Sequence, residues 1–203
     1  MKKTQVRIVA GRFGGRRLNS APGTRPTGER VREAVFSRLG PEVEGARVLD
    51  LYAGSGALGL EALSRGAASV VLVERSGRAL AAIDANLAAL GLADEVRCLR
   101  CHVGRAVQVL SERGGLFDLV LADPPYAESA ALEETTSVAK AIIGLSVAGC
   151  LRAGALVVVE HRRQDALSVT WPGFQVDAER DYGDTRVTYL RHQGRDTPAP
   201  GEE

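Results

Sequence analysis

The chain has 203 residues, of which 45% are hydrophobic and 25% are charged, and its net charge is +1 at pH 7. This length and composition predict one soluble globular domain with room for a small appendage. No run of about 18 apolar residues and no apolar segment after the first lysines is present, which argues against a membrane span and a secretory signal. Three cysteines, Cys98, Cys101 and Cys150, do not make a disulfide framework, so we expect a cytoplasmic protein.

Positive charge is concentrated at the start of the chain. The first 40 residues hold ten Lys or Arg and two acids, so this segment carries +8 and the remainder sums to −7. Such polarity predicts a polyanionic partner that approaches the N-terminal part. The arginines alternate with structure-forming residues, which favours a nucleic acid partner over a solvated basic tail.

The first elements are short. Segments 6–10 and 12–18 alternate with glycines and predict a small β-hairpin that carries Arg12, Arg16 and Arg17. A loop rich in Pro, Gly and Ser follows, and a helix capped by Thr27 is expected to run as far as Leu39.

From residue 47 onward, strands and helices alternate regularly. The expected strands are 47–51, 70–74, 96–100, 117–122 and 155–161, and the expected helices are 57–65, 77–90, 104–112 and 131–150. Alternation of this kind predicts a parallel sheet with helices on both faces. Two final strands, 174–181 and 185–191, flank a turn at Tyr182-Gly183-Asp184 and predict an antiparallel hairpin. The expected fold class is therefore α/β, Rossmann-like, with seven mostly parallel strands closed by that hairpin.

A glycine-rich turn follows the first strand of this sheet, between Asp50 and the helix that begins after Gly56. Glycines allow a ligand to approach the backbone, and the helix N-terminus leaves N–H groups facing it. Glu74 ends the next strand, where a carboxylate can accept both hydroxyls of a ribose. The glycine pattern also fits a dinucleotide fingerprint. Asp50, however, suits the cationic aminoacyl end of S-adenosylmethionine better than a pyrophosphate; alternatively, Asp50 and Glu74 only fix local turns.

Asp123-Pro124-Pro125-Tyr126 follows the apolar strand 117–122 and is the most informative motif. The Asp123 carboxylate and the Pro124 carbonyl can accept hydrogen bonds from one planar –NH2 group, and the Tyr126 ring can stack on the heterocycle that carries it. Ligands of open parallel sheets bind beyond the carboxyl ends of the strands. The sequence therefore predicts that the glycine turn, Glu74 and Asp123 meet at one edge, with cofactor and base side by side.

These residues resemble the class I S-adenosylmethionine-dependent methyltransferases: Asp50 to Gly59 their cofactor motif, Glu74 their ribose-binding acid, and Asp123 to Tyr126 their amino-methylating motif. Segments 7–18 and 25–36 are similar to the bacterial 16S ribosomal RNA guanine-N2 methyltransferase family, over about residues 6–192. That resemblance implies methyl transfer to the N2 amine of a guanine in 16S rRNA, position 966. The implied partner is 16S rRNA or the assembling small subunit, without a membrane, and we expect a monomer.

The resemblance also divides the chain and assigns its residues. The divisions are a basic RNA-binding extension at 1–26, a methyltransferase domain at 27–192 and a disordered tail at 193–203. The implied catalytic residues are Asp123, Pro124, Pro125 and Tyr126, and no metal is expected. The implied cofactor-binding residues are Asp50, Tyr52, Ala53, Gly54, Ser55, Gly56, Glu74, Arg25, Thr27 and His102. The implied RNA-binding residues are Arg12, Arg16, Arg17, Arg30 and Arg32.

One position departs from the methyltransferase pattern. An Asp or Asn beside the adenine often follows the third strand, but this chain has Arg100-Cys101-His102, so backbone N–H groups, Cys101 or His102 would contact the adenine. Cys98 and Cys101 have the spacing of half a zinc site, although their place in a strand favours buried thiols. We expect structural roles for His161 and Trp171, and a solvated His192.

Three other functions remain open on sequence grounds. A DNA adenine-N6 methyltransferase uses the same Asp-Pro-Pro-Tyr motif on a different amine, but no inserted DNA-recognition domain is visible. An NAD-dependent dehydrogenase fits the glycine turn but not Asp50, the Asp-Pro-Pro-Tyr motif or the terminal hairpin. A nucleic-acid-binding module without catalysis is the least favoured, because the motif is complete.

Overall fold

A computed structural model describes residues 6–20, 28–125, 136–164 and 171–194. Its main sheet has seven strands in the order β5-β4-β3-β6-β7-β9-β8. The strands are β3 (Arg47–Asp50), β4 (Ser69–Glu74), β5 (Val96–Arg100), β6 (Phe117–Ala122), β7 (Leu151–Arg162), β8 (Phe174–Tyr182) and β9 (Thr185–His192). The first five strands of that order are parallel, and β9 pairs antiparallel with β7 and β8. The predicted fold class is confirmed.

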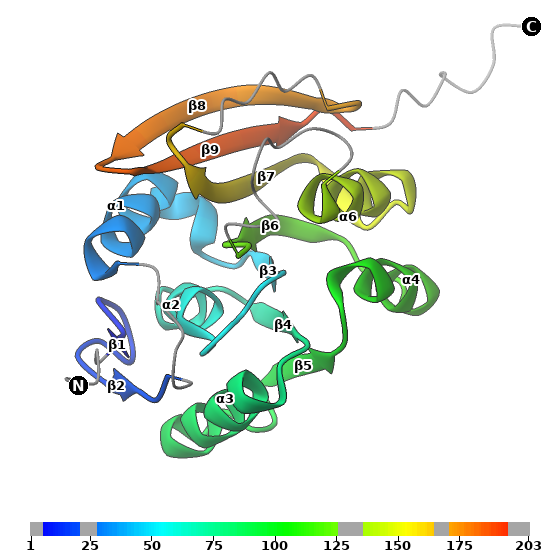
Figure 1. Ribbon diagram of the computed structural model, residues 1–203. Helices are drawn as coiled ribbons and strands as arrows, with labels where there is room; N and C mark the ends of the chain where they lie inside the picture. The colour runs from blue at the N-terminus through cyan, green and yellow to red at the C-terminus, as the bar shows by residue number, and fades with distance from the viewer. Residues whose placement is uncertain (1–5, 21–27, 126–135, 165–170, 195–203) are drawn as a thin grey trace, which may run out of the picture.

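Helices cover both faces of this sheet (Figure 1). One face packs against α1 (Glu29–Leu39), α2 (Ala57–Ser64) and α3 (Gly77–Leu90), and the other against α4 (Val103–Arg113) and α6 (Ser137–Val147). The central strands are therefore buried on both sides: Val48 belongs to the first core cluster and its neighbour Leu49 to the second. Burial on both faces explains why these strands are nearly continuous apolar runs.

Some element boundaries differ from the sequence predictions. Strand β7 begins at Leu151 rather than at residue 155, because Leu151 pairs with Phe117 before the register shifts and Leu156 pairs with Leu119. The exposed residues 152–154 between them look like a turn in the sequence. Helix α6 spans Ser137–Val147 within the expected range 131–150, of which residues 131–135 lie outside the described residues. Helix α1 has Gly28 at its N-cap position, so the expected cap at Thr27 was wrong.

The N-terminal hairpin forms as predicted and is part of the same core. Strands β1 (Val6–Arg7) and β2 (Arg17–Leu18) are antiparallel, and Val6, Ile8 and Leu18 are buried in the cluster that also contains Phe36 of α1 and residues of α2. Figure 1 shows the hairpin beside α2. The basic extension is thus packed onto the body of the protein.

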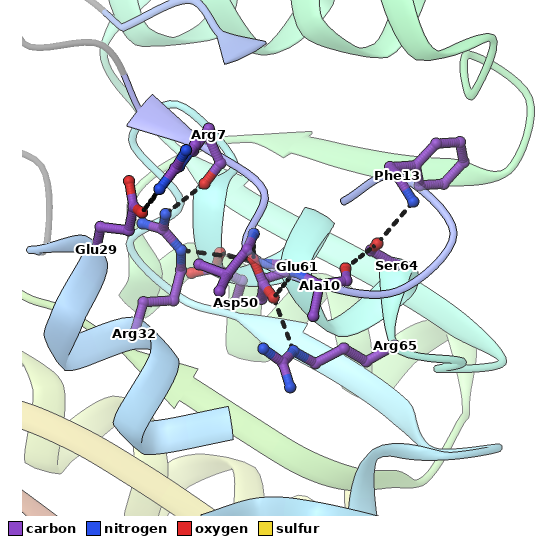
Figure 2. Close-up of polar contacts among 11 residues, drawn as sticks. Arg7, Ala10, Phe13, Glu29, Arg32, Asp50, Glu61, Ser64 and Arg65 are labelled. Atoms are coloured by element: carbon purple, nitrogen blue, oxygen red, sulfur yellow. Dashed lines mark hydrogen bonds and ion pairs between the residues drawn. The ribbon is translucent and has the colours of Figure 1, made fainter. Parts of the chain in front are cut away.

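Two polar side chains of α2 hold this hairpin (Figure 2). The Glu61 carboxylate accepts hydrogen bonds from the backbone N–H of Val9 at 2.6 Å and of Ala10 at 3.1 Å. The Ser64 hydroxyl donates to the Ala10 carbonyl at 2.5 Å and accepts from the Phe13 N–H at 2.9 Å. Between them, Gly11 has φ +80, and a Cβ there would lie 1.8 Å from the Ser64 carbonyl oxygen. The chain can approach α2 this closely only at a glycine.

The C-terminal part follows the sequence expectations with one exception. Gly183 adopts φ +65 in the turn of the β8–β9 hairpin, and Trp171 is buried edge-on against Phe174. His161 is buried and contacts the Thr188 hydroxyl at 2.9 Å, as a structural residue does. His192 was expected to be solvated, but it is only 3% exposed and lies 2.9 Å from the Ser146 hydroxyl. That prediction was wrong because β9 extends to His192 and packs against α6.

Within the described ranges, none of the helices has the length and apolar character that a membrane crossing requires. The predicted tail at 193–203 falls almost entirely on residues 195–203, which lie outside those ranges.

Candidate active site

A cavity of about 680 Å³ opens at the carboxyl ends of the parallel strands. It brings together the three motifs that the sequence predicted to meet there, which follow β3, β4 and β6. The predicted residues that line it are Tyr52, Ala53, Gly54, Ser55, Glu74, His102, Asp123, Pro124 and Pro125. Gly56 is not among the lining residues; it has φ +80 at the N-cap of α2, where its backbone makes the turn. The predicted residues Arg25, Thr27 and Tyr126 lie outside the described residues.

Glu74 joins two loops of the cavity. One of its carboxylate oxygens accepts the Gly54 N–H at 2.8 Å, and the other accepts the N–H groups of Arg75 at 2.8 Å and Ser76 at 2.7 Å. A carboxylate has about four lone-pair positions, so Glu74 keeps capacity to accept a hydroxyl of a ligand. Its position on the wall agrees with the expectation of a ribose-binding acid and with a role in fixing the loops.

Asp50 lies behind the wall and not in it. Its side chain is fully buried, and one carboxylate oxygen accepts the Gly59 N–H at 3.0 Å. Burial, with the charges of Asp123 and Glu74, raises the pKa of Asp50 to about 7. Asp50 is not among the residues that line the cavity. Asp50 thus fixes the glycine turn and the start of α2, as the alternative interpretation holds, and its contact with the cofactor stays a prediction.

The end of β5 supplies Cys101 and His102 to the cavity. His102 is exposed at the N-cap of α4, where its Nδ1 accepts the Gly104 N–H at 3.2 Å. Burial raises the pKa of the thiols of Cys98 and Cys101, which favours the protonated, apolar form. In the part of the chain that the structure describes, no three His, Cys, Asp or Glu side chains are grouped as metal ligands.

Glu160 is a lining residue that the sequence reasoning missed. It lies on β7, directly after the apolar run 155–159. An acid directly after an apolar run is the signal that singled out Glu74, and it was present here as well. Ala122 of β6 pairs with Val159 of β7, and the next residues along these parallel strands are Asp123 and Glu160. Burial, with the negative charge of Asp123, raises the pKa of Glu160 to about 8. The cavity therefore holds two neighbouring carboxyl groups.

The raised pKa of Glu160 predicts a pH-dependent difference in stability between wild type and Glu160→Gln. A carboxyl whose folded pKa exceeds its unfolded value stabilises at low pH, and that contribution disappears as the pH rises through the folded pKa. We therefore expect Glu160→Gln to gain free energy of unfolding relative to wild type between pH 5 and pH 8, by at least about 1 kcal/mol. Urea denaturation of both proteins across this range measures the difference; a constant difference would contradict a raised pKa.

The basic residues predicted to bind RNA divide into two groups. Arg12, Arg16, Arg17 and Arg30 are exposed. Arg32 is only 1% exposed; its guanidinium donates to the Arg7 carbonyl at 2.5 Å and lies 3.7 Å from the Glu61 carboxylate. The prediction that Arg32 binds RNA was wrong, because its side chain is enclosed between the hairpin and α2 (Figure 2).

The seven-stranded sheet with its antiparallel last hairpin, and the cavity at its carboxyl edge, define the fold of the class I methyltransferases. The chain belongs to the family described as "Conserved hypothetical protein 95", whose model matches residues 6–191. This membership confirms the family resemblance found in the sequence.

Curated and solved relatives agree with this placement. The chain is 36% identical to "Ribosomal RNA small subunit methyltransferase D" of Escherichia coli over 93% of this chain and 90% of that protein. It is 33% identical to YlbH of Bacillus subtilis over 93% of this chain and all of the relative. The solved structure of yhhF from Escherichia coli is 34% identical and superimposes with a TM-score of 0.77, over 94% of this chain and 99% of that one.

Proposed function

We propose that the protein transfers the methyl group of S-adenosylmethionine to the exocyclic N2 amine of a guanine in small-subunit ribosomal RNA. The observation that carries this proposal is the meeting of the glycine turn, Glu74 and Asp123 in one cavity. The E. coli relative named as a small-subunit rRNA methyltransferase supports the RNA substrate. The target position 966 is the one that the family resemblance of the sequence implies, since the name of this relative gives the small-subunit rRNA but no position.

The residues of the cavity fit S-adenosylmethionine along its whole length. Backbone groups of the glycine turn and the N-terminus of α2 face the methionine end, Glu74 the ribose, and Cys101 with His102 the adenine side. A neutral thiol and an apolar wall including Val73, Val103 and Ala79 suit a flat adenine ring. When bound, S-adenosylmethionine supplies a methyl group on a sulfonium, which is already an activated electrophile.

Asp123 and Pro124 act on the nucleophile. The lone pair of the guanine amine is delocalised into the ring, and hydrogen bonds to the Asp123 carboxylate and the Pro124 carbonyl draw the nitrogen toward a tetrahedral geometry. They also disperse the positive charge that develops on it. Holding the nitrogen in line with the methyl group and the sulfur supplies most of the remaining rate acceleration. Tyr126 is proposed to stack on the base, a contact of about 1–3 kcal/mol.

The exposed arginines of the hairpin are proposed to hold the RNA backbone. Replacing Arg12, Arg16 and Arg17 together by Ala should weaken RNA binding and reduce the dependence of the binding constant on salt, because fewer counterions are released. Filter binding at several salt concentrations measures both effects. The matched control replaces Arg152, Arg163 and Arg180, which are exposed on or next to β7 and β8. An unchanged salt slope in the hairpin variant would remove these arginines from the RNA site.

Mapping of methylated nucleosides tests the function as a whole. We expect mass spectrometry of rRNA from cells without this protein to show the loss of one N2-methylguanosine, restored by the wild-type gene but not by Asp123→Ala. In vitro, radiolabelled S-adenosylmethionine with small subunits, naked rRNA or DNA separates the RNA activity from that of a DNA adenine-N6 methyltransferase. Methyl transfer to DNA adenine, and none to RNA, would overturn the proposal.

A further inference from the structure

The strand order gives the cavity a direction. From one end to the other, its lining residues come from the ends of β5, β4, β3, β6, β7 and the start of β9. The parts that fit the cofactor, from His102 through Glu74 to the glycine turn, follow β5, β4 and β3. Asp123 follows β6 in the middle, so Glu160 of β7 and Thr185 of β9 lie on the opposite side of Asp123 from the cofactor. This end of the cavity is where the target base must enter.

Glu160 stands beside Asp123 at the same level of the sheet. The last register pair of β6 and β7 is Ala122 opposite Val159. The next residues of parallel in-register strands are about 4.8 Å apart, with side chains toward the same face. Both side chains line the cavity. The two carboxyl groups are thus neighbours, in an orientation that a flat ligand can contact at once.

Within the described residues, the Glu160 carboxyl has no structural role that would account for its place in the cavity. Glu160 is partly buried, and within those residues it forms no hydrogen bond or ion pair. The charge that acts on the Glu160 carboxyl is that of Asp123, which follows β6, and the residue paired with Glu160 on β9 is the apolar Val187. A partly buried carboxyl next to another carboxyl, without a cation to pair with, costs stability and is typical of a functional site.

We propose that Glu160 accepts the N1–H of the target guanine while Asp123 accepts the N2–H, so that two adjacent carboxyl groups recognise two adjacent donors of one base. This inference rests on the proposed function and names the residue that selects guanine. N1–H and the N2 amine are neighbours on the guanine ring, whereas the N1 of adenine is an acceptor and would face the Glu160 oxygen without a hydrogen. The charged carboxylate only accepts, whereas the neutral carboxyl also carries one O–H that can donate to a bare N1, so the charged form is the one that selects guanine. The comparison of substrates is therefore made above the pKa of Glu160, about 8.

An RNA with 2-aminopurine in place of the target guanine tests this role. The analogue keeps the N2 amine but its N1 carries no hydrogen. We expect wild type to prefer guanine by about 100-fold or more in kcat/KM, because a site built around a donor rejects an analogue without it. In Glu160→Ala this preference should narrow by at least about tenfold. In Glu160→Gln, the amide can present its oxygen to the N1–H of guanine or its NH2 to the bare N1 of the analogue, so we expect the preference to narrow there as well, while the rate on guanine RNA stays above that of Glu160→Ala.

Two controls separate specificity from folding. Calorimetry with S-adenosylhomocysteine should give wild-type affinity in each variant, because Glu160 lies away from the cofactor side. If Glu160→Ala loses that affinity, Glu160→Met, of similar length and without an acceptor, takes its place. The test compares the preference for guanine over 2-aminopurine and not the absolute rate. If Glu160→Ala or Glu160→Met keeps the wild-type preference, the role of Glu160 is overturned and the proposed function is not. Wild type that transfers no methyl to the guanine RNA overturns the proposed function as well.

Discussion

Asp123→Ala is expected to lower methyl transfer by at least about 100-fold while leaving the affinity for S-adenosylhomocysteine close to that of wild type. Asp123 follows β6, which is next in the sheet to β3, and its side chain lines the cavity. In the proposed assignment it contacts the base and not the cofactor. Removing a group that stabilises charge only in the transition state lowers kcat and leaves ground-state binding unchanged. Loss of one such electrostatic contact costs roughly 10²–10³ in rate in other enzymes.

A radiolabelled-methyl assay measures the rate and calorimetry measures the affinity. Asp94→Ala is the matched control, since Asp94 is an exposed acid just before β5, at the opposite edge of the sheet from the cavity. We expect the control to keep wild-type turnover. Turnover of Asp123→Ala within about threefold of wild type would contradict the role of Asp123, and loss of S-adenosylhomocysteine binding would assign Asp123 to the cofactor and not to the base.

The sheet and its order of elements were predictable because their signal is local. Buried parallel strands are apolar runs of four to six residues, and the helices between them have apolar periodicity. The meeting of Glu74 and Asp123 in one cavity followed from the rule that parallel strands share one carboxyl edge. Boundaries were less predictable: the irregular start of β7 depends on its pairing with Phe117, which lies far away in the sequence.

The roles of Glu160 and Arg32 depend on partners that the sequence does not identify. Glu160 matters because β7 pairs with β6 in a register that sets it beside Asp123. Arg32 lies three and four residues before Val35 and Phe36, on the buried face of α1, so helical periodicity alone could have placed it inside. Its charge suggested RNA binding because the buried acid that faces it, Glu61, is on a different helix.

Asp50 has a local role that the motif alone does not reveal. Its position before the glycine turn predicts contact with the cofactor, and in the structure one carboxylate oxygen also accepts the Gly59 N–H. Gly59 is needed at this point because a Cβ there would lie 2.4 Å from the Leu72 side chain, which is itself fully buried. Asp50 and Gly59 thus position α2 against β4, and with it the start of the helix that faces the cavity.

Glu61→Ala is expected to destabilise the protein by about 3–5 kcal/mol, because it removes one partner of a buried ion pair. Glu61 is fully buried, accepts two backbone N–H groups of the hairpin, and lies 2.7 Å from Arg65 Nε and 3.7 Å from Arg32 Nε (Figure 2). Without it, the Arg32 guanidinium remains buried without its ion-pair partner. A loss of this size is a large fraction of the total stability of a typical domain, about 5–15 kcal/mol.

Urea denaturation measures this loss, and Glu29→Ala is the matched control. Glu29 also pairs with an arginine, Arg7, at 2.6 Å, but the Arg7 and Glu29 side chains are 59% and 37% exposed, so the expected loss is below about 1 kcal/mol. Equal losses in the two variants would contradict the role of burial. Hydrogen exchange locates the effect: the amides of Val9 and Ala10 should lose protection first, since Glu61 is their acceptor. Because α2 starts at the glycine turn, an undocked hairpin would leave one side of α2 without its packing partner.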